Sequence, residues 1–263
     1  MPQLDYLDTD KKFIDFTKNN IDLINFCISV DSSYRNAFNE DYEGSSAELI
    51  KKHWKFNETS ITKICQQIDK ENSTHLAVSG HKKNPIKFDD KNNENNQGVK
   101  IIVDKIIKIN NFENELKKSN PKLVDIIADA VDGISKFSFA SKFCTYVSRY
   151  KDGNDNAYSI YDKVISEILP YYEWKFLGTM KHIRRKQNQS KEIVSTIEDD
   201  FANKENGFKY NDYNTLIGQI IEAINKEKNL KVDRLTFDRM LWYYYKGDEK
   251  LRQDALNEIP LQY

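Results

Sequence analysis

Apolar residues recur along most of the chain at the spacing of α-helices. Residues 61–68 carry isoleucine and cysteine at positions i, i+3, i+4 and i+7, and residues 99–106 repeat this pattern with valine and isoleucine. A longer face in residues 213–224 consists of Tyr213, Leu216, Ile217, Ile220, Ile221 and Ile224. Glycine and proline, which interrupt helices, number only 9 and 5 among 263 residues. The pattern predicts a mainly α fold.

Polar residues mark where several of these helices begin. Ser45 followed by Glu48 forms a capping box, and Asn120 before a proline is a typical helix start. Ser138 is predicted to be the N-cap of a further helix, and Gly133 to end the helix before it. We expect the core of this C-terminal region to include Ile126, Phe139, Phe143, Val164 and Ile168.

The predicted elements form two helical parts that pack closely into one compact fold. The first, residues 1–120, contains a long polar loop at 73–98 with a short strand at Leu76–Val78. A loop of this length is either functional or disordered. The second part, residues 121–263, contains a hairpin-like turn followed by Asp162.

The composition narrows the classes of partner. Charged residues make up 31% and hydrophobic residues 39% of the chain, and the net charge is −1, so contact with nucleic acid requires a local basic patch. Three widely separated cysteines indicate buried free thiols in a reducing compartment, which predicts a cytoplasmic protein. No signal peptide and no apolar run long enough to span a membrane are visible, so we expect no membrane partner.

Residues 133–165 carry the most chemical information. Two predicted helices flank a polar loop and the extended dipeptide Ile160-Tyr161, and Asp162 stands at the start of the second helix. A carboxylate fixed there beside an aromatic ring is either a helix cap or a catalytic group. The residue types alone leave both roles open.

Two short motifs in this stretch resemble a known family. Phe139-Ala140-Ser141-Lys142-Phe143 and Ser159-Ile160-Tyr161-Asp162 are similar to motifs of the helix-hairpin-helix DNA glycosylases, and more closely of the bacterial 8-oxoguanine DNA glycosylase-like proteins. A late helix of that family is similar to Leu235 through Trp242. The resemblance spans residues 121–247 at most and is sharp only within residues 133–165.

The resemblance implies a role for each matching residue. Gly133-Ile134-Ser135 would be the hairpin that binds a DNA phosphate, although the family has Gly-x-Gly there. Asp162 would stabilise the positive charge that develops on the sugar, next to Tyr161. Ser138 stands where bifunctional members have a lysine nucleophile, with Lys136 and Lys142 nearby but off register. This implies a monofunctional glycosylase that acts on duplex DNA without a cofactor, or a protein that kept the fold and lost the chemistry.

A second basic site is predicted in the run from Lys181 to Lys186, which we assign to a helix, as we do the segment from residue 171 to Ile183. Its members, which would lie together and bind phosphates, are Lys181, Arg184, Arg185 and Lys186. The alternative is a solvated surface whose charge is balanced by Glu192 and Glu198.

Other functions remain as alternatives. The spacing of Asp162, Glu173 and Lys175 is that of metal-dependent nucleases, but that chemistry needs the last two residues on a strand, and we predict a helix there. The four histidines have no zinc-ligand spacing with the cysteines, so no metal site is expected. The main alternative is a non-catalytic helical module that contacts a protein or nucleic acid, for example in phage defence.

Overall fold

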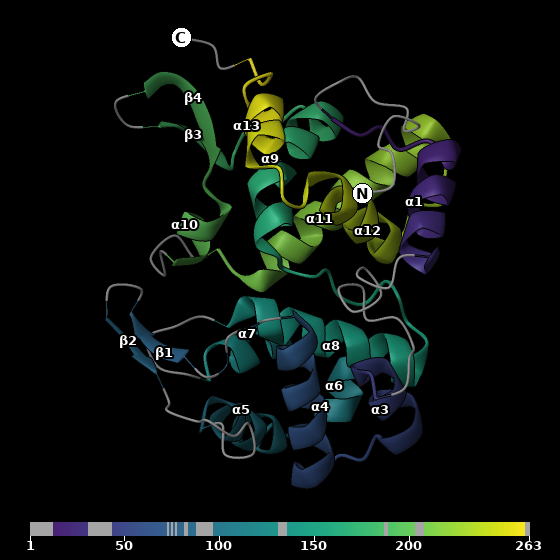
Figure 1. Ribbon diagram of the computed structural model, residues 1–263, viewed down its shortest axis with the longest axis vertical. Coiled ribbons are helices and arrows are strands. Elements are labelled where there is room, and N and C mark those ends of the chain that lie inside the picture. The colour runs from purple at the N-terminus through teal and green to yellow at the C-terminus, as the bar shows by residue number, and fades with distance from the viewer. Residues whose placement is uncertain are drawn as a thin grey trace. The chain divides into compact units, whose positions relative to one another are not determined.

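The computed structural model describes residues 13–30, 44–72, 74, 76, 78–81, 84–87, 97–130, 136–186, 189–202 and 208–260. The chain divides into two compact units, one formed by Met1–Val30 with Tyr161–Tyr263 and the other by Asp31–Ile160. Both are mainly helical, as predicted (Figure 1). The second unit is an insertion in the first. This division differs from the boundary predicted between residues 120 and 121.

The inserted unit is built around one helix. Its elements are α3 (Ser46–His53), α4 (Glu58–Asn72), β1 (Val78–His81), β2 (Asn84–Lys87), α5 (Gln97–Ile107), α6 (Phe112–Lys117), α7 (Lys122–Ala128) and α8 (Phe137–Asp152). Helix α8 contacts α3, α4, α6 and α7. Every residue from Phe139 to Ser148 is therefore buried, whichever side of the helix it occupies. Strands β1 and β2 form an antiparallel hairpin, so the predicted strand begins at Val78 rather than Leu76.

The other unit combines a helix from the start of the chain with the C-terminal elements. These are α1 (Lys18–Val30), α9 (Lys163–Leu177), β3 (Ile183–Lys186), β4 (Gln189–Ser195), α10 (Ile197–Ala202), α11 (Tyr210–Lys228), α12 (Arg234–Tyr245) and α13 (Glu249–Leu256). Helix α9 contacts α10, α11, α12, α13 and β4, and α1 packs against α12. The buried Tyr172 hydroxyl of α9 donates to the Ile14 carbonyl at 3.1 Å and lies 3.1 Å from the Tyr245 hydroxyl. Segments from both ends of the chain thus share one core.

The predicted core is confirmed in most of its members. Phe139, Phe143, Val164 and Ile168 are buried, but Ile126 is 38% exposed and its prediction was wrong. The short helix α7 packs on α8 through other positions, which leaves Ile126 outside. The two phenylalanines belong to the inserted unit, whereas Val164 and Ile168 belong to the unit formed by Met1–Val30 and Tyr161–Tyr263, so these residues form two cores rather than one.

Of three predicted helix ends, one is confirmed and two were wrong. The Glu48 N–H donates to the Ser45 side chain at 3.0 Å, which confirms the predicted cap of α3. Ser138 is not an N-cap, because α8 begins one residue earlier and Lys136 precedes it. The helix predicted to reach Ile183 ends at Leu177, where Gly178 adopts a left-handed conformation with φ of +70°.

The three cysteines, Cys27, Cys65 and Cys144, are buried and free, as predicted. In the part of the chain that the structure covers, no helix combines the length and the apolar character needed to cross a membrane.

Candidate functional site

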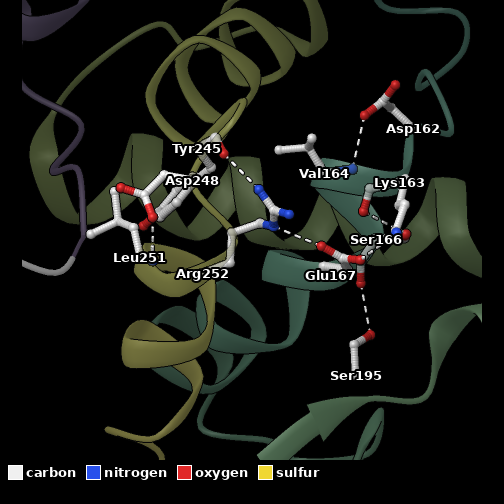
Figure 2. Close-up of polar contacts among 10 residues, drawn as sticks. All are labelled: Asp162, Lys163, Val164, Ser166, Glu167, Ser195, Tyr245, Asp248, Leu251 and Arg252. Atoms are coloured by element: carbon white, nitrogen blue, oxygen red, sulfur yellow. Dashed lines mark hydrogen bonds and ion pairs between the residues drawn. The ribbon is translucent and has the colours of Figure 1, made fainter.

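Asp162 begins the candidate site as the N-cap of α9 (Figure 2). Its backbone is extended, and its carboxylate accepts a hydrogen bond from the Val164 N–H at 2.8 Å. The Ser166 N–H donates to the Asp162 backbone carbonyl at 2.9 Å, which closes the first turn. A capping aspartate stabilises a helix by about 0.5–2 kcal/mol, and the helix N-terminus in turn favours a negatively charged carboxylate. The local sequence therefore fixes this carboxylate in place.

Tyr161, directly before the cap, lies in an aromatic cluster. Its ring meets Phe201 of α10 and Tyr213 of α11 edge-on, at centroid distances of 5.1 and 5.4 Å. Burial raises the pKa of the Tyr161 phenol, and the nearby Glu198 carboxylate adds to this increase. The phenol consequently stays protonated and can donate a hydrogen bond, but it is a poor general base. The aromatic wall predicted beside Asp162 is present within this unit.

A side chain of the β3–β4 hairpin replaces a backbone hydrogen bond that a proline removes from α9. Pro170 has no N–H, so the carbonyl of Ser166, four residues earlier, lacks its usual helical donor. The Ser195 hydroxyl at the end of β4 donates to that carbonyl at 2.7 Å (Figure 2). Ser166 is only 3% exposed, so water has little access to replace this donor. The side chain from β4 thus satisfies the bond that proline removes.

A buried arginine neutralises the next carboxylate along α9. Arg252 of α13 is 9% exposed, and its Nε donates to Glu167 Oε2 at 2.6 Å while its NH1 group donates to the Tyr245 carbonyl at 2.7 Å (Figure 2). Lys163 adds a looser ion pair with Glu167 at 3.5 Å. Arg252 thus joins Glu167 of α9 to the end of α12, and Lys163 adds a second positive charge near this carboxylate.

The basic run lies on a strand, so its prediction as a helix was wrong. Residues 183–186 form β3, which pairs antiparallel with β4. Side chains alternate between the two faces of a strand, so Arg184 and Arg185 point to opposite sides. Arg184 pairs with Asp199 at 2.7 Å and Lys186 with Glu192 at 2.9 Å. Of the two acidic residues predicted to balance this surface, Glu192 makes an ion pair there, and Asp199 makes the other ion pair. The exposed basic residues are Lys181, Arg184 and Lys186.

Two lysines of the inserted unit are buried. Lys136 and Lys142, at the start of α8, are each 6% exposed, which does not suit the direct phosphate contact predicted for them. Lys142 Nζ donates to Ser138 Oγ at 3.0 Å, one helical turn away. Burial lowers the pKa of Lys136, an effect that the Asp69 carboxylate opposes. The start of α8 therefore carries a serine and two buried lysines within seven residues.

The predicted DNA-binding turn at Gly133 and Ser135 lies outside the described residues. The helices on either side of it, α7 and α8, pack against each other, and the Lys136 N–H donates to the Ala128 carbonyl at 3.0 Å. The two flanking helices therefore pack together within the inserted unit.

The geometry that a metal-dependent nuclease requires is not present at Glu173 and Lys175. Glu173 and Lys175 lie on α9, as the sequence indicated, and not on a strand. Glu173 is 1% exposed and accepts a hydrogen bond from Thr179 at 2.7 Å, while Lys175 pairs with Asp15 at 2.8 Å. Among the residues with described positions, no group of three or more histidine, cysteine or acidic side chains is arranged to hold a metal ion.

Comparisons with known proteins give one partial match. The family model HI_0787_N, described as an N-terminal domain, matches residues 32–152. This range falls within the inserted unit, Asp31–Ile160, and ends with the last residue of α8. No curated protein and no solved structure matches the chain. The chain is thus similar to that family over the inserted unit, and the segment with Asp162 lies beyond the match.

Several contacts of the site were not predicted from the sequence. Arg252 and Glu167 are 85 residues apart, and Ser195 and Ser166 are 29 apart, so no local spacing connects them. Pro170 did offer an indication, because a proline inside a helix leaves the carbonyl four residues earlier in need of another donor. The burial of Lys142 could have been suspected from its position between apolar residues on both sides of a helix.

Proposed function

We propose that the protein binds duplex DNA and excises or recognises a modified base in the manner of a monofunctional DNA glycosylase. The observation that supports this proposal is the placement of Asp162 as the N-cap of α9, directly after Ile160 and Tyr161, which lie outside the helix. This is the position in which the resemblance requires the catalytic carboxylate.

The proposed role of Asp162 is electrostatic. Breaking the bond between base and sugar leaves positive charge on the sugar, and a fixed carboxylate stabilises that charge without moving. Asp162 receives an orienting hydrogen bond from the Val164 N–H and lies at the positive end of a helix. Its carboxylate is therefore held in one direction before any substrate binds.

The DNA contacts proposed from the structure differ from those expected from the sequence. The buried Lys136 and Lys142 are unsuited to the phosphate backbone, whereas the side chains of Lys181, Arg184 and Lys186 are exposed on and beside β3. Two of these basic groups are paired with surface carboxylates, which phosphates would displace. The β3–β4 hairpin is accordingly the proposed phosphate-binding element of the C-terminal unit.

The test compares two aspartates that have the same structural role. Asp248 caps α13 as Asp162 caps α9, and it accepts the Leu251 N–H at 2.8 Å. Asparagine is as good an N-cap as aspartate, so Asp162→Asn and Asp248→Asn should both fold normally. Duplexes that contain modified bases are incubated with each protein, and abasic sites are counted. Base release should be lost in Asp162→Asn and retained in Asp248→Asn.

Other outcomes would change the proposal. Equal release by wild type and Asp162→Asn would remove this carboxylate from the mechanism. Borohydride should trap no protein–DNA adduct, because the proposed mechanism uses water and no amine. A trapped adduct would show that Lys136 or Lys142 attacks the sugar.

The second candidate function is a non-catalytic helical interaction module. It is favoured by the capping bond from Val164, which accounts for Asp162 without any chemistry. Absence of base release by the wild-type protein on every duplex, with DNA binding retained, would favour this module.

A further inference from the structure

A serine and a lysine at the start of α8 are arranged as a nucleophile and its base. Ser138 lies in the first turn of the helix, and Lys142 is four residues further on, so both side chains lie on the same side of α8. The distance between Lys142 Nζ and Ser138 Oγ is 3.0 Å. Ser138 is half-buried, whereas Lys142 is 6% exposed. The serine thus keeps some exposure to solvent, and the lysine beside it keeps very little.

We propose that Ser138 and Lys142 form a catalytic pair for acyl transfer, with an ester or amide carbonyl as substrate. A serine hydroxyl is a weak nucleophile until a neighbouring base accepts its proton. An uncharged amine can be that base, and serine–lysine pairs serve this purpose in enzymes of unrelated fold. Lys142 Nζ lies next to the Ser138 hydroxyl, so a proton that leaves Ser138 has an amine beside it to accept it.

The position on the helix adds a second favourable element. The N–H groups of the first turn of a helix carry partial positive charge, which stabilises negative charge nearby. The residue before α8, Lys136, makes no side-chain capping bond to this turn. An oxyanion that forms next to Ser138 would thus lie close to the positive end of α8.

The proposed reaction conserves atoms and charge. Ser138 Oγ attacks the carbonyl carbon while its proton passes to Lys142 Nζ. The bond from the carbonyl carbon to the leaving oxygen or nitrogen then breaks, and the proton on Lys142 moves to the leaving group. Water next attacks the acyl-serine, with Lys142 accepting the water's proton and returning it to Ser138 Oγ as the acid departs. No metal, oxidant or cofactor is needed.

This inference goes beyond the proposed glycosylase function and does not depend on it, because Asp162 has no part in it. The two proposals also place their chemistry in different units of the chain.

The experiment uses the full chain and a fluorophosphonate probe, which attaches covalently to activated serines. Intact mass and peptide mapping should show one label, on Ser138. Ser138→Ala should abolish labelling. Ser141→Ala is the matched control, because Ser141 is a fully buried serine on the same helix whose hydroxyl donates to the Ser138 carbonyl at 3.3 Å. This control should retain the label.

The variant Lys142→Arg tests whether Lys142 acts as a base or only supports the position of Ser138. Arginine keeps a positive hydrogen-bond donor near Ser138 but cannot accept a proton at accessible pH. Labelling should fall by roughly 10²–10⁴-fold in this variant, the usual contribution of a general base. The wild-type rate should rise with pH to a plateau, and this dependence should vanish in Lys142→Arg.

Thermal melting of each variant accompanies the labelling, and Lys142→Met replaces Lys142→Arg if the latter does not fold. The proposal is overturned by a wild-type protein that takes no label, by a label that persists in Ser138→Ala, or by a folded lysine variant that labels at the wild-type rate.

Discussion

Replacing Ser195 by alanine tests whether a side chain from the hairpin completes helix α9. The Ser195 hydroxyl supplies the donor that Pro170 cannot give to the Ser166 carbonyl, at 2.7 Å. Ser195→Ala leaves this buried carbonyl without that donor, and an unsatisfied buried polar group costs about 1–3 kcal/mol. The Ile197 N–H also loses its acceptor, Ser195 Oγ, at 3.3 Å. We therefore expect a loss of about 2–3 kcal/mol in the free energy of unfolding.

Urea denaturation followed by circular dichroism measures this loss. With a denaturant slope of about 2 kcal/mol per M, the transition midpoint should fall by roughly 1–1.5 M. Ser29→Ala is the matched control, because the Ser29 hydroxyl also donates to a helical carbonyl, that of Phe26, at 2.7 Å, but in an exposed position. Water can replace that bond, so the control should change stability by less than about 0.5 kcal/mol.

A double-mutant cycle isolates the role of proline. In a Pro170→Ala background the new N–H can bond to the Ser166 carbonyl, so Ser195→Ala should cost about 1–2 kcal/mol less than in the wild type. An equal cost in both backgrounds would refute the link between Pro170 and Ser195. A loss as small as that of Ser29→Ala would show that the hydroxyl does not support the helix at all.

Three further predictions concern the core, a buried charge and the basic strand. Phe143 is fully buried beside three other aromatic rings, so Phe143→Ala should lower the free energy of unfolding by about 3–5 kcal/mol. Phe26 is 61% exposed, so Phe26→Ala should lower it by less than about 0.5 kcal/mol, and urea denaturation measures both changes. Because burial lowers the pKa of Lys136, the unfolded chain binds this proton more tightly, so stability should increase as the pH rises from the lowered pKa toward the ordinary one. Lys136→Met should therefore be more stable than wild type near neutral pH, with an advantage that shrinks as denaturation is repeated up to about pH 10; an advantage independent of pH would contradict this. In DNA-binding titrations over a salt series, Arg184→Ala should reduce the dependence of log K on log salt by about one, and adding Arg185→Ala should change it little, because adjacent strand residues point to opposite faces; a reduction of about two for the double variant would contradict the strand geometry.

The helical character and the main apolar faces could be predicted because each of those helices packs along one side. The residues of 61–68, 99–106 and 213–224 that repeat at helical spacing are all buried. Helix α8 is different, since it is buried on all sides and its polar residues do not mark a solvent face. The only sequence signal for the burial of Lys142 is the presence of apolar residues on both sides of this helix. An apolar residue at helical spacing also need not be inside, as Ile126 shows.

The candidate site was predictable only where it depends on local sequence. The position of Asp162 at the start of a helix follows from the apolar residues after it, and the structure places it there. The basic run was misassigned because apolar spacing continues from Trp174 to Ile183, although Gly178 ends the helix. Whether the following residues form a strand is decided by pairing with β4, a partner that lies further along the chain.

The insertion of one unit into the other has a consequence for the order in which the protein folds during synthesis. Residues 31–160 are continuous, so the inserted unit can fold once they have left the ribosome. Helix α1 has to wait, because its partner helix α12 is made some 200 residues later. Until then, the apolar side of α1, with Ile24 and Ile28, has no native surface to cover it. Ribosome-bound chains that end before Arg234 should accordingly carry a protease-resistant inserted unit and a cleavable N-terminal helix.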